Sequence, residues 1–123
     1  AISELLAGNK NILRIIDEAP DFYTGAHILA MVCGAEEYML NKKFLKERKI
    51  RALLGNFKIL GIEREEAIKA AEIIGELKAS GEDITLEEAF TFAHLLLNGL
   101  ILVTKNREIG RKLKKMGVES KII

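Results

Sequence analysis

Hydrophobic residues in this chain recur at two spacings, one typical of amphipathic helices and one typical of short buried strands. The helical spacing predicts helices over residues 2–8, 11–18, 27–40, 42–54, 63–79, 85–98 and 106–116. Short apolar runs predict strands over residues 22–24, 57–62, 100–103 and 118–123. Because strands and helices alternate, we expect an α/β fold in which the strands form one mostly parallel sheet with helices on both faces.

Local signals mark the ends of the last two predicted helices. Thr85 is the expected N-cap of the helix over 85–98, and Glu88, three residues later, completes a capping box. Asn106 is the expected N-cap of the final helix. Gly99 and Gly117 follow these two helices and are expected to end them.

Length and composition limit the class of protein. With 123 residues, 49% of them hydrophobic, the chain is expected to form one domain over residues 1–123 with its own core. Its apolar runs are shorter than the ~18–20 residues that span a bilayer, so no membrane association is expected. Asn9, Lys10 and Arg14 interrupt any apolar run near the start, so we expect no signal peptide and a cytoplasmic location. The single cysteine, Cys33, excludes an internal disulfide framework and a cysteine-based zinc site.

The net charge of +1 is unevenly distributed along the chain. Residues 42–51 carry six basic side chains and one acidic one, and residues 105–121 carry seven basic and two acidic ones. Residues 63–88 carry nine acidic and three basic side chains. The basic segments are typical either of solvated helix faces or of a surface that attracts phosphates. For an RNA-binding surface, the candidate residues are Lys42, Lys43, Lys46, Arg107, Arg111, Lys112 and Lys115.

The predicted helix over 85–98 carries one polar stripe on an otherwise apolar surface. Glu87, Thr91, His94 and Asn98 follow one another at helical spacing. The stripe either faces water or an interface, or its members meet polar partners or line a cleft. His27 follows the first predicted strand, and either histidine alone is more typical of a structural residue than of a ligand.

Three stretches of the chain form a recognisable set, and they read AISELLAGN, DFYTGAHILAMVCGAEE and EEAFTFAHLLLNGLILVTKNREI. Together they resemble the PIN domain family, especially the VapC-type toxin ribonucleases and related archaeal proteins. The resemblance implies a three-layer α/β/α fold with a mostly parallel sheet, and a Mg²⁺- or Mn²⁺-dependent RNA endonuclease with carboxylates at the carboxyl edge of that sheet. Hard cations of this kind prefer oxygen ligands and activate a bound water.

By this resemblance, not all of the family's acidic positions fall on acidic residues of this chain. The first strand and its aspartate would precede Ala1, and the second position falls on Met31, whose thioether is a poor magnesium ligand. The third and fourth positions fall on Glu88 and Asn106, which are therefore the implied metal ligands. Thr104 matches a small hydroxyl residue of the same turn, so the implied catalytic set is Glu88, Asn106 and Thr104. Two further carboxylates could substitute only in a different geometry, namely Glu87 and Glu36.

The sequence leaves more than one function open. The first is a PIN-like ribonuclease whose acidic site is incomplete and whose Mg²⁺ or Mn²⁺ binding is weak. The alternative is a non-catalytic module that binds RNA or an antitoxin-like protein, and a third is a scaffold or dimerisation domain. We also expect the chain to form a homo-oligomer, namely a dimer. The family's first strand lies in the middle of its sheet. Its absence would leave neighbouring strands unpaired unless the chain rearranges, or another chain or further residues fill the gap.

Overall fold

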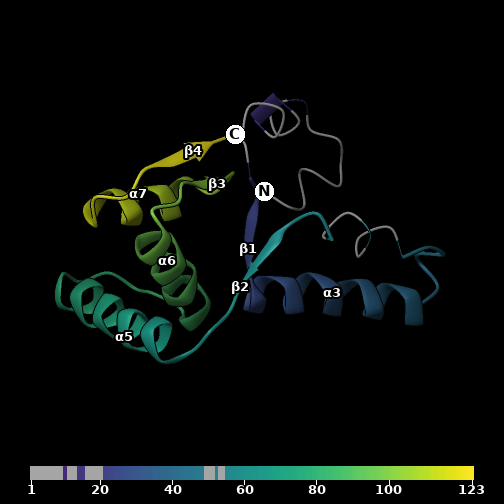
Figure 1. Ribbon diagram of the computed structural model, residues 1–123, viewed down its shortest axis with the longest axis horizontal. Helices are drawn as coiled ribbons and strands as arrows, with labels where there is room; N and C mark the ends of the chain where they lie inside the picture. Colours follow the sequence, from purple (N-terminus) through teal and green to yellow (C-terminus); the bar gives the residue numbers. More distant parts are fainter. Residues whose placement is uncertain (1–9, 11–13, 16–20, 49–51, 53–54) are drawn as a thin grey trace.

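The computed structural model describes residues 10, 14–15, 21–48, 52 and 55–123 (Figure 1). Strands and helices alternate along this part of the chain as predicted, and the fold is mixed α/β. The elements in chain order are β1 (Tyr23–Gly25), α3 (Ala26–Asn41), β2 (Lys58–Leu60), α5 (Arg64–Ala79), α6 (Leu86–Asn98), β3 (Leu102–Thr104), α7 (Arg107–Lys115) and β4 (Ser120–Ile122). The predicted helix over 2–8 and most of the one over 11–18 lie outside the described residues.

The strands are parallel, as predicted, but they form two separate sheets rather than one. β1 pairs with β2, with Thr24 opposite Ile59, and β3 pairs with β4, with Val103 opposite Lys121. Among the described residues no ladder joins one pair to the other. Each pair is closed by a crossover that contains a helix, whereas the connection between the pairs consists of two helices that pack on each other. The expectation of a single sheet is therefore wrong for the described residues, and a three-layer PIN-like arrangement stays a prediction.

The core lies between helices rather than on a sheet. Its buried residues come from α5, α6 and α7 (Figure 1), and Phe92 and Leu113 are among the largest apolar ones. The core residues are Ala70, Ile73, Leu77, Ala89, Phe92, Ala93, Leu95 and Leu113. The apolar spacing that predicted helices over 63–79 and 85–98 therefore marks the faces that meet in this core.

The predicted caps of the last two helices are confirmed. Thr85 accepts a hydrogen bond from the backbone N–H of Glu88, whose carboxylate accepts one from the N–H of Thr85. Asn106 caps α7 through its side-chain oxygen. Gly99 ends α6 in the left-handed region at φ 60°, a conformation that a residue without a Cβ adopts at little cost.

The predicted basic helix over 42–54 is not present over residues 42–48. α3 ends at Asn41, and the following residues form a turn and irregular chain. Lys43 has φ 62°, and the N–H of Phe44 donates to the carbonyl of Met39 over 2.9 Å, which is the geometry of a Schellman helix end. Because a lysine rather than a glycine takes the left-handed position, the residue pattern did not predict this break. Residues 49–51 and 53–54 lie outside the described residues.

No helix in the described part of the chain combines the length and apolar character needed to cross a membrane.

Candidate functional site

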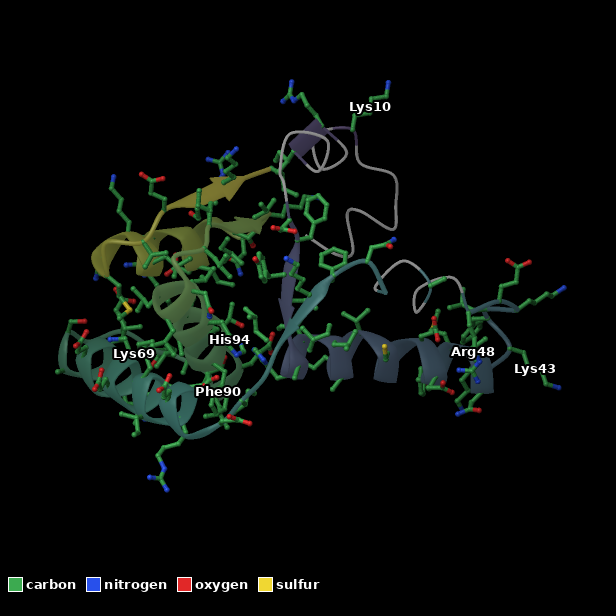
Figure 2. The ribbon with its side chains drawn as sticks, viewed as in Figure 1. Lys10, Lys43, Arg48, Lys69, Phe90 and His94 are labelled. Atoms are coloured by element: carbon green, nitrogen blue, oxygen red, sulfur yellow. The ribbon has the colours of Figure 1, made fainter. Side chains whose placement is uncertain are left out.

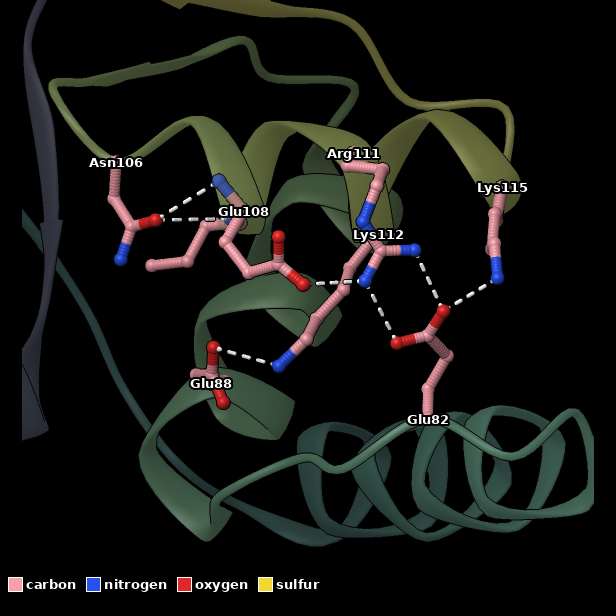
Figure 3. A network of polar contacts seen from close by, with 8 residues as sticks. Glu82, Glu88, Asn106, Glu108, Arg111, Lys112 and Lys115 are labelled. Carbon is pink, nitrogen blue, oxygen red and sulfur yellow. Dashed lines mark hydrogen bonds and ion pairs between the residues drawn. The ribbon is translucent and has the colours of Figure 1, made fainter.

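Glu88, the predicted principal metal ligand, lies in the first turn of α6 and already has two partners, of which Figure 3 shows Lys112. Its Oε1 accepts a hydrogen bond from the N–H of Thr85 over 3.0 Å, and its Oε2 lies 3.5 Å from Nζ of Lys112. The side chains of Glu88 and Lys112 are only 17% and 11% exposed. The carboxylate is therefore held between a helix cap and a largely buried ammonium group.

The side-chain oxygens of Asn106 and Thr104 already accept backbone hydrogen bonds in the turn between β3 and α7. Oδ1 of Asn106 accepts hydrogen bonds from the N–H groups of Glu108 and Ile109, over 3.0 and 3.2 Å. Oγ1 of Thr104 accepts one from the N–H of Asn106 over 3.1 Å, and Thr104 is buried. The oxygen that Asn106 would offer a metal is the oxygen that caps α7.

These residues, as arranged, do not fit a Mg²⁺ or Mn²⁺ site. A hard divalent cation needs several oxygen ligands with free lone pairs, and Glu88 faces a cation while Asn106 faces two N–H donors. Within the described ranges, no group of three or more His, Cys, Asp or Glu side chains could hold a metal ion. Metal binding by this chain stays a prediction.

The two substitute carboxylates do not join Glu88. Glu36 lies in the distal half of α3, is 1% exposed, and has Nη1 of Arg48 at 3.9 Å from its carboxylate. Figure 2 shows Arg48 at the far end of α3, well away from His94 on α6. Glu87 is exposed in the first turn of α6 and contributes to the electrostatics around His27. Met31, the implied second acidic position, is exposed on α3.

The predicted RNA-binding residues of α7 are largely neutralised by acidic partners (Figure 3). Arg111 forms a bidentate ion pair with Glu82, at 2.6 and 2.9 Å, and also pairs with Glu108. Lys115 pairs with the same Glu82, whose pKa these two cations lower to about 2. These pairs fix α7 on the segment between α5 and α6, and the contact of Lys112 with Glu88 fixes it on the first turn of α6.

The remaining RNA candidates are exposed. Arg107 begins α7 directly after Asn106 and has no ion pair among the described residues, and Lys105 on the other side of Asn106 is in the same situation. Lys42, Lys43 and Lys46 lie at the tip beyond α3, where Nζ of Lys42 is 5.9 Å from the centre of the Tyr38 ring. These exposed candidates therefore lie at two places, one beside the β3–α7 turn and one at the α3 tip.

A pair of histidines that sequence reasoning treated separately lies at the carboxyl end of β1. The rings of His27 and His94 are 5.5 Å apart between centroids. Nε2 of His94 donates to the carbonyl of Gly61 over 2.8 Å, and Nε2 of His27 is 2.9 Å from Oγ1 of Thr91. The two Nδ1 atoms are buried and have no hydrogen-bond partner in the described structure.

The histidine pair shows that the polar stripe of α6 meets partners. Thr91 and His94 connect α6 to α3 and to the segment after β2, and Nδ2 of Asn98 donates back to the carbonyl of His94 over 2.8 Å. The sequence shows only that one histidine follows a predicted strand and that another lies on an apolar helix. It does not indicate that the two side chains meet.

Acidification below pH ~6.5 is expected to destabilise the protein through His27. Burial, followed by the nearby His94, lowers the pKa of His27, while Glu87 raises it less. The unfolded chain then binds a proton more readily than the folded one, so the free energy of unfolding falls as pH drops below that value. Urea midpoints measured from pH 5 to 8 should fall at the acid end, and His27→Gln should remove much of that slope. An unchanged slope in the variant would contradict this assignment.

The chain matches no protein-family model, and the search of curated proteins found no match to it. Membership in the PIN family therefore stays a prediction that rests on the resemblance of the three quoted stretches.

Proposed function

We propose that this chain is a PIN-like protein of the metal-dependent ribonuclease type that binds RNA without cleaving it. The observation that carries the proposal is the contact between Glu88 and Lys112, in which a tethered ammonium lies where a divalent cation would be needed. A metal bound there would displace Lys112 and leave its ammonium largely buried without a partner, which is costly. Using Asn106 as well would remove the cap of α7, at a cost of about 1 kcal/mol.

RNA binding on this proposal comes from the exposed cations that flank the implied site. Lys105 and Arg107 lie on either side of Asn106, at the carboxyl end of β3 where the resemblance puts the catalytic carboxylates. Exposed, unpaired cations release counterions from phosphates without first breaking an ion pair, whereas Arg111 and Lys115 would have to leave Glu82. The contacts are non-specific in sequence, because phosphates carry no base identity.

Reversing the charge of Lys105 and Arg107 together is expected to weaken RNA binding at least tenfold. The double variant Lys105→Glu, Arg107→Glu removes two phosphate contacts and adds repulsion. Fluorescence anisotropy with a labelled single-stranded RNA at low salt measures the affinity, and a parallel gel assay with and without Mn²⁺ measures cleavage. The matched control is Arg64→Glu, Lys78→Glu, which makes the same charge change at exposed positions at the two ends of α5.

We expect the control to bind within about twofold of the unmodified chain, and neither protein to cleave RNA above background. An equal loss of RNA affinity in both double variants would show that binding depends only on the net charge of the protein. Mn²⁺-dependent cleavage that Glu88→Gln abolishes would overturn the non-catalytic proposal and restore an active ribonuclease. An antitoxin-like protein partner stays a prediction of the sequence.

A further inference from the structure

Three exposed cations lie in one row along α7. Arg107, Arg111 and Lys115 follow one another at a spacing of four residues, which places them on one side of the helix. The helix rises about 6 Å between successive members. We name these three residues the α7 row. Arg107 has no ion pair among the described residues, whereas the other two members bind the carboxylate of Glu82 (Figure 3).

The carboxylate of Glu82 contacts the α7 row as a phosphate would. Its Oε1 and Oε2 accept hydrogen bonds from Nη1 and Nη2 of Arg111 over 2.6 and 2.9 Å, and Oε1 also accepts one from Nζ of Lys115. Arginine offers the same two parallel N–H donors to a carboxylate and to a phosphate. The side chains of Arg111 and Lys115 are 44% and 46% exposed, so both cations can be reached from solvent while they hold Glu82.

Replacing Glu82 by a phosphate requires only its side chain to move. The N–H of Glu82 donates to the carbonyl of Leu77 over 2.8 Å, which fixes the backbone in the connection between α5 and α6. Glu108 also pairs with Arg111, so the guanidinium keeps a partner that orients it after Glu82 leaves. Protonation does not release Glu82, because Arg111 and Lys115 lower its pKa to about 2. At neutral pH the carboxylate therefore has to be displaced by another anion.

We propose that Glu82 is an internal competitor for RNA, which occupies two of the three cations of the α7 row until RNA phosphates displace it. The inference rests on the proposed function, in which Lys105 and Arg107 first capture the RNA. A tethered competitor acts at an effective concentration of about millimolar, so a free phosphate at lower concentration does not replace it. An RNA strand already held at Arg107 also presents its neighbouring phosphates in tethered form. The contact with Glu82 thus favours RNA strands over single phosphates.

Glu82→Gln is expected to strengthen RNA binding about fivefold or more, because the amide keeps an acceptor for Arg111 but loses the competing charge. Two released cations should steepen the slope of log affinity against log salt by about 1.4 for a single strand. Fluorescence anisotropy with a labelled single-stranded RNA over a series of salt concentrations measures both quantities. Glu72→Gln is the matched control, since Glu72 also pairs with an exposed lysine, Lys69, over 3.4 Å, and the charge change is the same.

Two further variants separate competition from net charge and from effects on folding. Glu82→Asp keeps the charge but shortens its reach by one methylene, and it should give a smaller gain than Glu82→Gln. Adding Arg111→Gln and Lys115→Gln to Glu82→Gln should cancel the gain, because the released cations are then gone. Circular dichroism checks that each variant folds. A gain that persists in this triple variant would overturn the proposal, as would an equal gain from Glu72→Gln or no gain from either Glu82 variant.

The source of the phosphate is tested by competition. Inorganic phosphate at about 1 mM, with ionic strength held constant, should leave RNA binding by the unmodified chain unchanged. Release of the RNA under these conditions would contradict the preference for strands.

The proposed function fails separately from the competitor. If Lys105→Glu, Arg107→Glu does not weaken binding but Glu82→Gln strengthens it, the capture site is wrong and the competitor stands. If the double variant loses RNA and Glu82→Gln gains nothing, the competitor is wrong and the capture site stands. An absence of RNA binding in both the unmodified chain and Glu82→Gln would overturn both.

Discussion

Phe92→Ala is expected to lower the free energy of unfolding by about 3–5 kcal/mol. Phe92 is 0% exposed and belongs to the core that α5, α6 and α7 share. Removing its ring loses the transfer free energy of the side chain and leaves a cavity that the neighbouring helices fill only in part. Since small domains are stable by only ~5–15 kcal/mol, the variant retains little margin.

The same substitution at an exposed phenylalanine provides the control. Phe44 is 69% exposed, so Phe44→Ala is expected to change the free energy of unfolding by less than ~0.5 kcal/mol. Guanidinium chloride unfolding followed by circular dichroism measures both variants. Similar losses at the two positions would mean that the core does not lie between α5, α6 and α7.

Gly25→Ala is expected to cost about 1–3 kcal/mol, as is usual when a well-packed site is overfilled. A Cβ at Gly25 would lie 2.5 Å from Cε1 of His27 and 2.9 Å from Nδ1 of His94. The backbone of Gly25, with φ −74°, suits any residue, so the cost comes from the two rings alone. The control is Gly75→Ala, where the Cβ has open space and the helix gains ~0.5–1 kcal/mol. The two alanine variants should therefore shift the denaturant midpoint in opposite directions.

A double-mutant cycle identifies the origin of that cost. Adding His27→Ala to Gly25→Ala should recover part of the lost stability, because the nearest ring is then gone. Strict additivity of the two changes would show that Gly25 is restricted by something other than the histidine pair.

Local features of the fold could be predicted from the sequence because their causes lie within a few residues. The capping box of Thr85 and the N-cap of Asn106 depend on side chains two or three positions from the groups they satisfy. The break after α3 could not be predicted, because Lys43 takes a conformation that sequence patterns assign to glycine. The division into two sheets could not be predicted either. Which strand edges meet depends on how α5 and α6 pack, because these helices connect the two strand pairs. This packing involves residues far apart in the sequence.

The candidate site shows the same limit. The resemblance named Glu88, but only the structure shows that Lys112, 24 positions later, neutralises it. Likewise, the basic segment over 105–121 is typical either of solvated helix faces or of a surface that attracts phosphates. Arg111 and Lys115 are in fact engaged by Glu82, a residue of the acidic segment. A run of like charge in a sequence gives the number of cations and does not reveal which of them are already paired.

The packing of α5 against α6 has a consequence for the order of folding. These helices are neighbours in sequence, joined by a short connection, and they supply most of the core. The contacts between these helices close a small loop. Pairing β1 with β2 closes a longer one, because the chain between Thr24 and Ile59 includes all of α3. Loop closure costs more entropy as the intervening chain lengthens, and local contacts form first. The α5–α6 hairpin is thus the expected folding nucleus. We expect the β1–β2 pair to pack on it late, when His94 forms its hydrogen bond with the carbonyl of Gly61.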